Sequence, residues 1–220
     1  MAGDATTTVK VAGTAGVPAD ATAVVVNLTA DAPTADGYLT AYPHGTGRPT
    51  VSNLNFPTGR TVANQAVVPV GADGSIDVYN HVGNTRVVVD VFGYYSPGGK
   101  GRFTPTVPVR VRDTRSDGTR LPLGPGAWAA VPLAGSHGVP ANATAAVLNV
   151  TAVAPTSNGY LTVWPDGTAR PGTSNLNLVP GAITPNHVTT PLGTGGAADV
   201  YNSAGSTHVV ADLEGWFSED

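Results

Sequence analysis

The chain has no cysteine, which excludes disulfides, thiolate nucleophiles and cysteine-based zinc sites. Charged residues are scarce, at 12% with a formal net charge of −4, whereas proteins bind a nucleic-acid backbone through clustered lysine and arginine. No run approaches the ~20 apolar residues of a membrane-spanning helix. The first residues also lack the basic and apolar parts of a signal peptide, so an export signal would lie upstream. We therefore expect no nucleic-acid partner and no membrane span.

The residues that are abundant favour strands. The 220 residues include 28 glycines and 19 prolines, with much threonine, valine, alanine and asparagine. Glycine and proline suit tight turns and β-branched residues suit strands, whereas a helical protein would have more leucine, glutamate and lysine. With 41% hydrophobic residues, the chain can also bury a core. These features predict an all-β fold.

The chain contains one sequence pattern twice, at an offset of 122 residues. Residues 4–95 align with residues 126–217 without a gap. The clearest matches are Gly37-Tyr38-Leu39-Thr40 with Gly159-Tyr160-Leu161-Thr162, Ser52-Asn53-Leu54-Asn55 with Ser174-Asn175-Leu176-Asn177, and Asp77-Val78-Tyr79-Asn80 with Asp199-Val200-Tyr201-Asn202. Because loop lengths are equal throughout, the pattern predicts two repeats that share one backbone.

The segment 96–125 has no counterpart in the first repeat. The linker-like stretch 97–101 marks the boundary, so we expect a first repeat over 1–98 and a complete second repeat over 99–220. The first repeat then lacks its opening strand. Either that repeat is trimmed, or residues 103–112 serve a neighbour. An open sheet edge would also favour self-association or donor-strand assembly.

Turn residues divide the complete repeat into about eight short candidate strands. These are residues 108–112, 128–133, 144–152, 159–164, 174–178, 187–192, 198–202 and 208–217. Pro43 and Pro165 stand where strands should stop. The spacing is typical of an antiparallel β-sandwich or a barrel-like arrangement.

A string of specific motifs runs through the second repeat. It consists of Asp113-Thr114-Arg115, Asn149-Val150-Thr151, Gly159-Tyr160-Leu161-Thr162, Arg170-Pro171, Ser174-Asn175-Leu176-Asn177 and Asp212-Leu213-Glu214-Gly215-Trp216-Phe217. Over nearly its whole length the chain resembles a tandem β-rich repeat of secreted actinobacterial proteins, which often accompanies proteases, esterases or wall hydrolases. The resemblance implies an extracellular, accessory β module. It carries over no ligand-binding residues.

One strand of each repeat carries alternating aromatic side chains. Alternation places Tyr38, Thr40 and Tyr42 on one face of the first of these strands. Sugars bind to ring faces beside planar polar groups, which predicts a glycan or cell-wall polymer site. The candidate binding residues are Tyr38, Tyr42, His44 and Arg48 in the first repeat, and Tyr160, Trp164, Asp166 and Arg170 in the second. The alternative is that these rings only pack inside a sandwich.

Asparagines recur at five matched positions. They are Asn27, Asn53, Asn55, Asn64 and Asn80 in the first repeat, and Asn149, Asn175, Asn177, Asn186 and Asn202 in the second. Asparagine suits a strand only when its amide is paired, so the recurrence favours a structural network bonded to turn backbone. The alternative is a calcium or sugar role for the carbonyls. No carboxylate cluster accompanies them, and we expect no metal site.

Two aspartates, Asp90 and Asp212, occupy matched positions in the closing strand of each repeat. A half-buried aspartate there needs a cationic or backbone partner. The candidate cations are Arg110, Arg112 and Arg115. A bidentate arginine would tie the opening segment to the closing strand.

Catalysis has little support in the sequence. Each of the five histidines aligns with another residue type in the other repeat, and the two glutamates, Glu214 and Glu219, have no match in the first. No G-x-S-x-G, H-E-x-x-H or phosphate-binding loop motif occurs. We expect no enzyme activity and no cofactor.

These observations favour a secreted, non-catalytic module that attaches a larger protein to a surface through a glycan or cell-wall polymer. One equivalent site per repeat would let two weak contacts gain affinity through avidity. The alternatives are a structural spacer, a protein-interaction module, and an assembly unit that exchanges strands.

Overall fold

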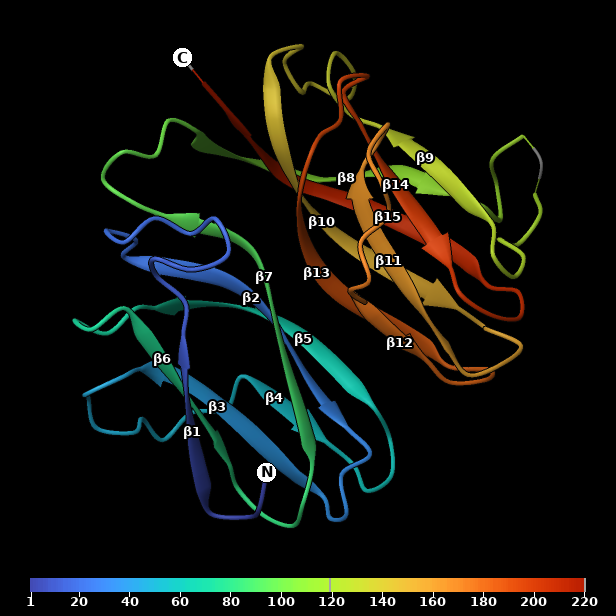
Figure 1. Ribbon diagram of the computed structural model, residues 1–220. Coiled ribbons are helices and arrows are strands. Elements are labelled where there is room, and N and C mark those ends of the chain that lie inside the picture. The colour runs from blue at the N-terminus through green and yellow to red at the C-terminus, as the bar shows by residue number, and fades with distance from the viewer. Residues whose placement is uncertain (119, 220) are drawn as a thin grey trace. The chain divides into compact units, whose positions relative to one another are not determined.

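The computed structural model describes residues 1–118 and 120–219, and every regular element among them is a β-strand. The predicted all-β class is confirmed. None of the described residues forms a helix long and apolar enough to cross a membrane. The chain divides into two compact units, Met1–Gly99 and Lys100–Asp220, each with its own core (Figure 1).

The first unit contains seven antiparallel strands in two sheets. They are β1 (Ala5–Lys10), β2 (Ala23–Asp31), β3 (Gly37–Pro43), β4 (Leu54–Phe56), β5 (Val62–Pro69), β6 (Ser75–Asn80) and β7 (Arg86–Tyr95). One sheet has the order β1-β6-β3-β4, and the other has the order β5-β2-β7.

Alternation along β2 accounts for the core of the first unit. The side chains of Val24, Val26 and Leu28 are fully buried. They belong to one cluster with Leu39 of β3 and Ile76 of β6, which lie in the other sheet. The two sheets therefore enclose the core as a β-sandwich. Each fully buried valine or leucine stabilises the fold by about 1.5–3 kcal/mol.

The second unit contains eight antiparallel strands in the part of it that the structure describes. They are β8 (Arg102–Asp113), β9 (Trp128–Pro132), β10 (Ala143–Val153), β11 (Gly159–Pro165), β12 (Leu176–Leu178), β13 (Ile183–Pro191), β14 (Ala197–Asn202) and β15 (His208–Ser218). The sheets have the orders β13-β10-β15-β8 and β12-β11-β14-β9. Leu148, Leu161 and Leu213, from three of these strands, are fully buried in the core between the sheets.

The two units use the same strand register. In the first unit β2 pairs Asn27 with Asp90 of β7, and in the second β10 pairs Asn149 with Asp212 of β15, each residue 122 positions later. Both pairings contain a register shift, after Val25 in β2 and at the matched position of β10. Such a bulge bends the strand and changes the direction of its side chains, and it lies at the matched position in both units.

The expected strands of the second repeat all occur in the expected order, but two begin at least four residues earlier than expected. β8 begins six residues earlier, at Arg102, and β13 begins four residues earlier, at Ile183. Each extension includes a proline, Pro105 or Pro185, which the sequence pattern placed outside strands. Both strands lie at a sheet edge, where the missing N–H of proline can face away from the ladder.

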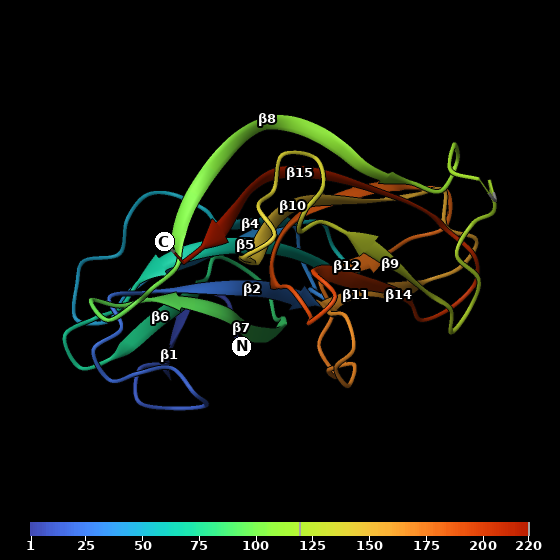
Figure 2. The same ribbon diagram turned by 90° about the horizontal axis from the view of Figure 1, so that it is seen from above.

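The sheets that contain β7 and β15 differ at one edge. In the second unit β8 pairs along β15, and Figure 2 shows the two strands running side by side. In the first unit β7 is an edge strand. The Met1 N-terminus donates to the Thr85 carbonyl at 2.7 Å, as the Leu123 N–H donates to the Thr207 carbonyl at 2.8 Å in the second unit. Met1 thus takes the place of Leu123, and none of the described residues pairs with β7 as β8 pairs with β15.

Candidate functional site

An arginine lies over a tyrosine ring in each unit. The guanidinium carbon of Arg48 is 3.7 Å from the centre of the Tyr79 ring, and that of Arg170 is 4.0 Å from the centre of the Tyr201 ring. The negative face of the ring attracts the cation and holds it flat. In the first unit the Tyr79 hydroxyl also donates a hydrogen bond to Asp4 at 3.0 Å, and an Arg48 guanidinium nitrogen lies 3.9 Å from the same carboxylate oxygen.

A second tyrosine extends the stack in the first unit. Tyr38 is tilted by 52° to Tyr79, with ring centres 6.3 Å apart, and it stacks on His81 at 4.4 Å and 14°. These rings meet because β3 and β6 pair antiparallel. We call Arg48, Tyr79, Tyr38 and His81 the aromatic row.

The second unit contains a shorter version of the aromatic row. Tyr160 is tilted by 48° to Tyr201, with ring centres 6.4 Å apart, and Arg170 covers Tyr201. Ser203 stands where the first unit has His81, and its hydroxyl oxygen accepts a hydrogen bond from the Tyr160 N–H at 2.8 Å. Three members of the row therefore recur and the exposed histidine does not.

An open depression of about 440 Å³ lies at the His81 end of the aromatic row. Its lining includes Asp36, Tyr38, Asn55, Phe56 and His81. Asp36 accepts hydrogen bonds from the N–H and the hydroxyl of Thr58, at 2.6 and 2.7 Å, which hold the pKa of this carboxyl below its usual value. The depression thus combines ring faces with a fixed carboxylate and an exposed amide.

Two of the predicted sugar-binding rings, Tyr42 and Trp164, are covered by other residues in the structure. Tyr42 is 7% exposed and Trp164 is 6% exposed, so neither ring offers a face to solvent. Thr40 is fully buried, and its hydroxyl donates to the Val51 carbonyl at 2.6 Å. The loop after the strand folds back over this face, and only the first tyrosine of each trio stays partly exposed.

The polar candidate His44 pairs with Asp77 of β6. Its Nδ1 lies 2.9 Å from the Asp77 Oδ1, which also accepts a hydrogen bond from the Thr8 hydroxyl at 2.7 Å. The hydrogen bond to Asp77 raises the pKa of His44 above its ordinary value. His44 therefore serves a local carboxylate and not the depression.

Two carboxylates occupy these positions in the second unit, Asp166 and Asp199. Asp199 is 4% exposed, and burial is the main cause that raises its pKa, with a contribution from the negative charge of Asp166. The backbone around the site is tightly packed in both units. A side chain on Gly193 would collide with the Asp166 backbone, and one on Gly71 would collide with the backbone of His44.

Matched asparagines tie strands to loops. Asn53 Oδ1 accepts a hydrogen bond from the Ala41 N–H, and Asn175 Oδ1 accepts one from the Val163 N–H, both at 2.7 Å. The Asn202 amide donates to three loop carbonyls at 2.9 to 3.2 Å. These bonds satisfy backbone groups that would otherwise be left unpaired.

Four of the remaining matched asparagines, at two pairs of positions, also lie inside strands. Asn27 and Asn149 stand opposite the closing-strand aspartates in their ladders. Asn55 of β4 is exposed, whereas Asn177 of β12 is partly buried. Of these four, Asn55 is the one that borders the depression.

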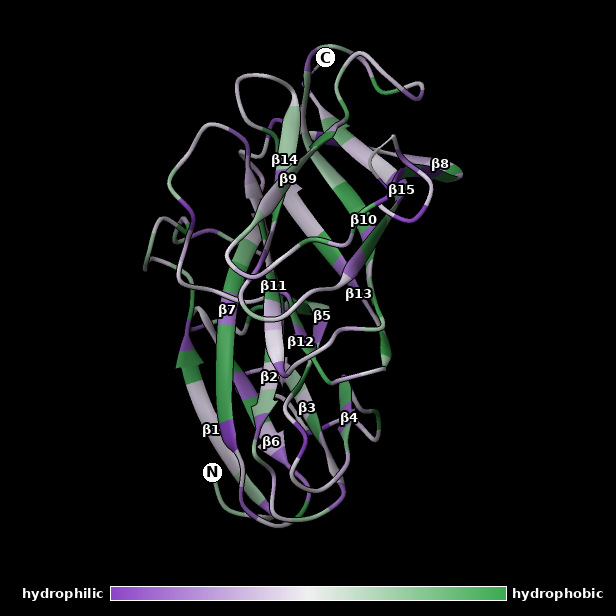
Figure 3. Cartoon of the chain, turned by 90° about the vertical axis from the view of Figure 1, so that its right-hand side faces the viewer, coloured by the Kyte–Doolittle hydropathy of each residue, from purple (hydrophilic) through white to green (hydrophobic). Residues whose placement is uncertain are grey.

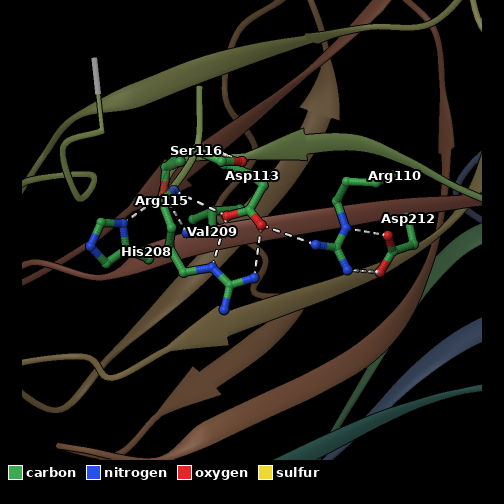
Figure 4. A network of polar contacts seen from close by, with 8 residues as sticks. Arg110, Asp113, Arg115, Ser116, His208, Val209 and Asp212 are labelled. Carbon is green, nitrogen blue, oxygen red and sulfur yellow. Dashed lines mark hydrogen bonds and ion pairs between the residues drawn. The ribbon is translucent and has the colours of Figure 1, made fainter. Parts of the chain in front are cut away.

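The Asp-Thr-Arg motif fixes the end of β8 (Figure 4). Two guanidinium nitrogens of Arg115 lie 2.8 and 2.7 Å from the Asp113 carboxylate, and these bonds hold the pKa of Asp113 well below its usual range. The Thr114 N–H donates to the Val209 carbonyl, and the Thr114 hydroxyl accepts from the Val209 N–H, both at 3.0 Å. The motif therefore joins β8 to the start of β15.

Of the three arginines considered for Asp212, Arg110 contacts it. The Arg110 Nε and Nη2 lie 2.5 and 3.3 Å from the two carboxylate oxygens, and Nη1 lies 3.0 Å from Asp113 (Figure 4). Arg112 instead pairs with Asp117 at 3.1 Å. The opening strand is thus bound to the closing strand by a bidentate ion pair.

Sequence reasoning did not select Tyr79, Tyr201 or His81 as site residues. Both tyrosines belong to the repeated Asp-Val-Tyr-Asn motif, which indicated a repeat but not a role. The missing information was the pairing of β3 with β6, which places Thr40 opposite Tyr79 and brings the neighbouring rings together.

Comparisons with known proteins assign no family and no function to the chain. No protein-family model matches the chain, and no curated protein matches its sequence. Among the described residues, no three histidine, aspartate or glutamate side chains gather as a metal site would need.

Proposed function

We propose that this chain is a secreted, non-catalytic module that attaches a larger protein to a surface by binding a glycan or cell-wall polymer. The supporting observation is the aromatic row beside the open depression of the first unit. Apolar C–H faces of sugars pack on aromatic rings, while their hydroxyls pair with planar polar groups. Both kinds of group border this depression.

Each residue around the depression has its own part in this proposal. His81 is exposed and Tyr38 stacks behind it, so the pair offers a braced ring surface to a sugar. Asp36 is held by Thr58 and accepts hydrogen bonds from sugar hydroxyls. The exposed Asn55 amide both donates and accepts hydrogen bonds.

The second unit supplies a weaker site of the same kind. Tyr160 and Tyr201 keep their stack under Arg170, but Ser203 replaces the outer ring. Two unequal sites on one chain still gain affinity for a repeating polymer, because the second contact forms at a high effective concentration.

A pull-down on insoluble polysaccharides together with a glycan array tests the proposal. The test variant carries Tyr38→Ala and His81→Ala, which remove the ring surface, and it should lose most of the binding of the unmodified chain. The matched control is His187→Ala, which removes an exposed histidine from the second unit and should bind normally.

Two outcomes would contradict the proposal. Binding that survives the double substitution would place the site elsewhere. If the unmodified chain binds no polysaccharide at all, the structural spacer becomes the better interpretation.

A further inference from the structure

Arg170 holds a positive charge on the outer face of the sheet formed by β12, β11, β14 and β9. The side chain is exposed, and its guanidinium carbon lies 4.0 Å from the centre of the Tyr201 ring. Its Nη1 lies 3.5 Å from the Pro171 carbonyl oxygen, at the long limit of a hydrogen bond. The ring therefore positions the guanidinium, while most of its five N–H donors stay available to a ligand.

The first unit neutralises the matched arginine. An Arg48 guanidinium nitrogen lies 3.9 Å from Oδ1 of Asp4, the oxygen that accepts the hydrogen bond of the Tyr79 hydroxyl. The counterpart of Asp4 in the second unit is Gly126, which has no side chain. The second unit thus keeps the stack of arginine on tyrosine without this carboxylate.

Two other carboxylates of the second unit lie near this face, and neither forms an ion pair with Arg170 in the part of the chain that the structure describes. Asp199 stands two residues before Tyr201 in β14, so its side chain projects from the same face. Burial and then the negative charge of Asp166 raise the pKa of Asp199, and no described cation opposes them. Arg170 therefore keeps its charge for a group from outside the chain.

An exposed tryptophan lies beside this stack. β9 runs along β14 (Figure 3), and Trp128 of β9 stands directly opposite Tyr201. Residues in such a pair project from the same face of a sheet, with Cβ atoms about 4.5–5.5 Å apart. Trp128 is 58% exposed, whereas the matched residue of the first unit is Thr6. The second unit therefore adds an open indole ring next to the arginine.

The exposed rings of the two units lie at different ends of their tyrosine pairs. In the first unit His81 stacks on Tyr38, the tyrosine of β3. In the second unit Trp128 stands beside Tyr201, the tyrosine of β14, and Tyr160 of β11 lies on the other side at 6.4 Å. Three rings from three neighbouring strands and one guanidinium thus share one face of the second unit.

We propose that this face of the second unit binds a sugar that carries a carboxylate, such as a uronic acid residue of a polysaccharide. The apolar C–H face of the sugar packs on Trp128, and its carboxylate pairs with Arg170. A planar guanidinium suits a planar carboxylate, because two parallel N–H donors meet its two oxygens. The inference rests on the proposed binding of glycans and adds the class of sugar that the second unit selects.

Calorimetry on the full chain tests this choice with an oligogalacturonate and its methyl ester. The ester has the same sugar rings without the negative charge, so the acid should bind more tightly. Arg170→Gln should weaken binding of the acid roughly tenfold and leave the ester nearly unaffected, because it removes one partner of a charge-assisted pair. The matched control Arg120→Gln removes another exposed arginine of the second unit and should leave both affinities unchanged.

A second variant removes the charge of the site without removing the arginine. Gly126→Asp copies Asp4 of the first unit, and the matched backbone angles φ are 72° and 55°. A Cβ on Gly126 would meet nothing within 4 Å, so the variant should fold. The new carboxylate should pair with Arg170 and abolish the preference for the acid over the ester.

A third variant tests the ring. Trp128→Thr copies Thr6 of the first unit and should weaken binding of the acid and of the ester alike, because both sugars use the indole face. All three tryptophans lie in the second unit, so a change of tryptophan fluorescence on adding the acid reports binding there. Trp128→Thr should remove most of this change.

Three results would overturn the inference and leave the proposed function intact. The first is equal affinity of the unmodified chain for the acid and the ester. The second is a preference for the acid that both Arg170→Gln and Gly126→Asp leave unchanged. The third is binding of a sugar phosphate without binding of the acid, which would exclude the carboxylate. A chain that binds no polysaccharide, neutral or acidic, would contradict the proposed function as well.

Discussion

Arg110 and Asp212 face each other directly across β8 and β15, and two guanidinium nitrogens contact both carboxylate oxygens. Half of the arginine side chain is exposed, so solvent screens the pair. We expect Asp212→Ala to lower the free energy of unfolding of the second unit by about 1 kcal/mol. All three tryptophans lie in that unit, so tryptophan fluorescence during urea unfolding measures its stability separately.

The matched substitution in the first unit is the control for this pair. In the part of the chain that the structure describes, no arginine lies opposite Asp90, so Asp90→Ala should destabilise its own unit less than Asp212→Ala destabilises the second. Amide hydrogen exchange measures the stability of the first unit. Equal losses in the two units would show that the ion pair contributes nothing.

The Asn175 side chain gives a second prediction. It is 2% exposed, and its Oδ1 accepts the hydrogen bond of the Val163 N–H. Asn175→Ala leaves that buried N–H unpaired, so we expect a loss of about 2 kcal/mol in the free energy of unfolding. Asn55→Ala removes an exposed asparagine and should change stability by less than about 0.5 kcal/mol. Similar effects of the two substitutions would argue against a structural role for Asn175.

A third prediction exchanges matched residues between the units. Asp166→His would copy the contact of His44 with Asp77 and remove a negative charge beside Asp199, so the second unit should become more resistant to urea. The gain should be larger at pH 5.5 than at pH 8.5. The reason is that a histidine whose pKa is raised by folding stabilises the fold below its unfolded pKa, about 6.5, and loses this contribution as the pH rises through its folded pKa.

The reciprocal substitution, His44→Asp, should lower the urea midpoint of the first unit, measured by hydrogen exchange. A gain from Asp166→His that is the same at both pH values would mean that no His–Asp contact forms. No change from either substitution would contradict the prediction altogether.

The Asp113 carboxylate predicts a dependence of stability on acid. Arg115 holds the pKa of Asp113 well below its unfolded value of about 3.9. A group whose pKa is lowered by folding stabilises the fold above its unfolded pKa and loses this contribution as the pH falls through the folded pKa. The advantage of the unmodified chain over Asp113→Asn should therefore be constant from pH 7 to pH 5 and shrink below about pH 4. An advantage that stays constant down to pH 2.5 in urea unfolding would exclude this effect.

Alternation and turn residues were sufficient to predict the strands, because both are local properties of the sequence. For two strands, β8 and β13, the predicted start was several residues too late, and the residues that were missed include Pro105 and Pro185. A proline is tolerated at a sheet edge, and the sequence does not say which strands lie at edges. The position of a strand within its sheet depends on pairing between distant segments.

The candidate site likewise combines features that a local sequence pattern predicts with contacts between distant segments that it does not. Alternation placed Tyr38, Thr40 and Tyr42 on one face of β3, and the core takes Leu39 and Ala41 from the other face. The local pattern could not show that the loop containing Val51 packs on Thr40, or that Tyr79 arrives from another strand. Contacts between distant segments therefore decided which rings remain open to solvent.

Gly71 and Gly193 pack against the backbone of residues 44 and 166, and this packing limits how each unit can respond to a substitution there. Because the backbone of residues 44 and 166 lies against Gly71 and Gly193, a side chain at position 44 or 166 projects from a tightly packed point. That point faces the buried aspartate of β6 or β14. One residue thereby decides which group lies beside the buried aspartate, which is a histidine in the first unit and a second carboxylate in the second.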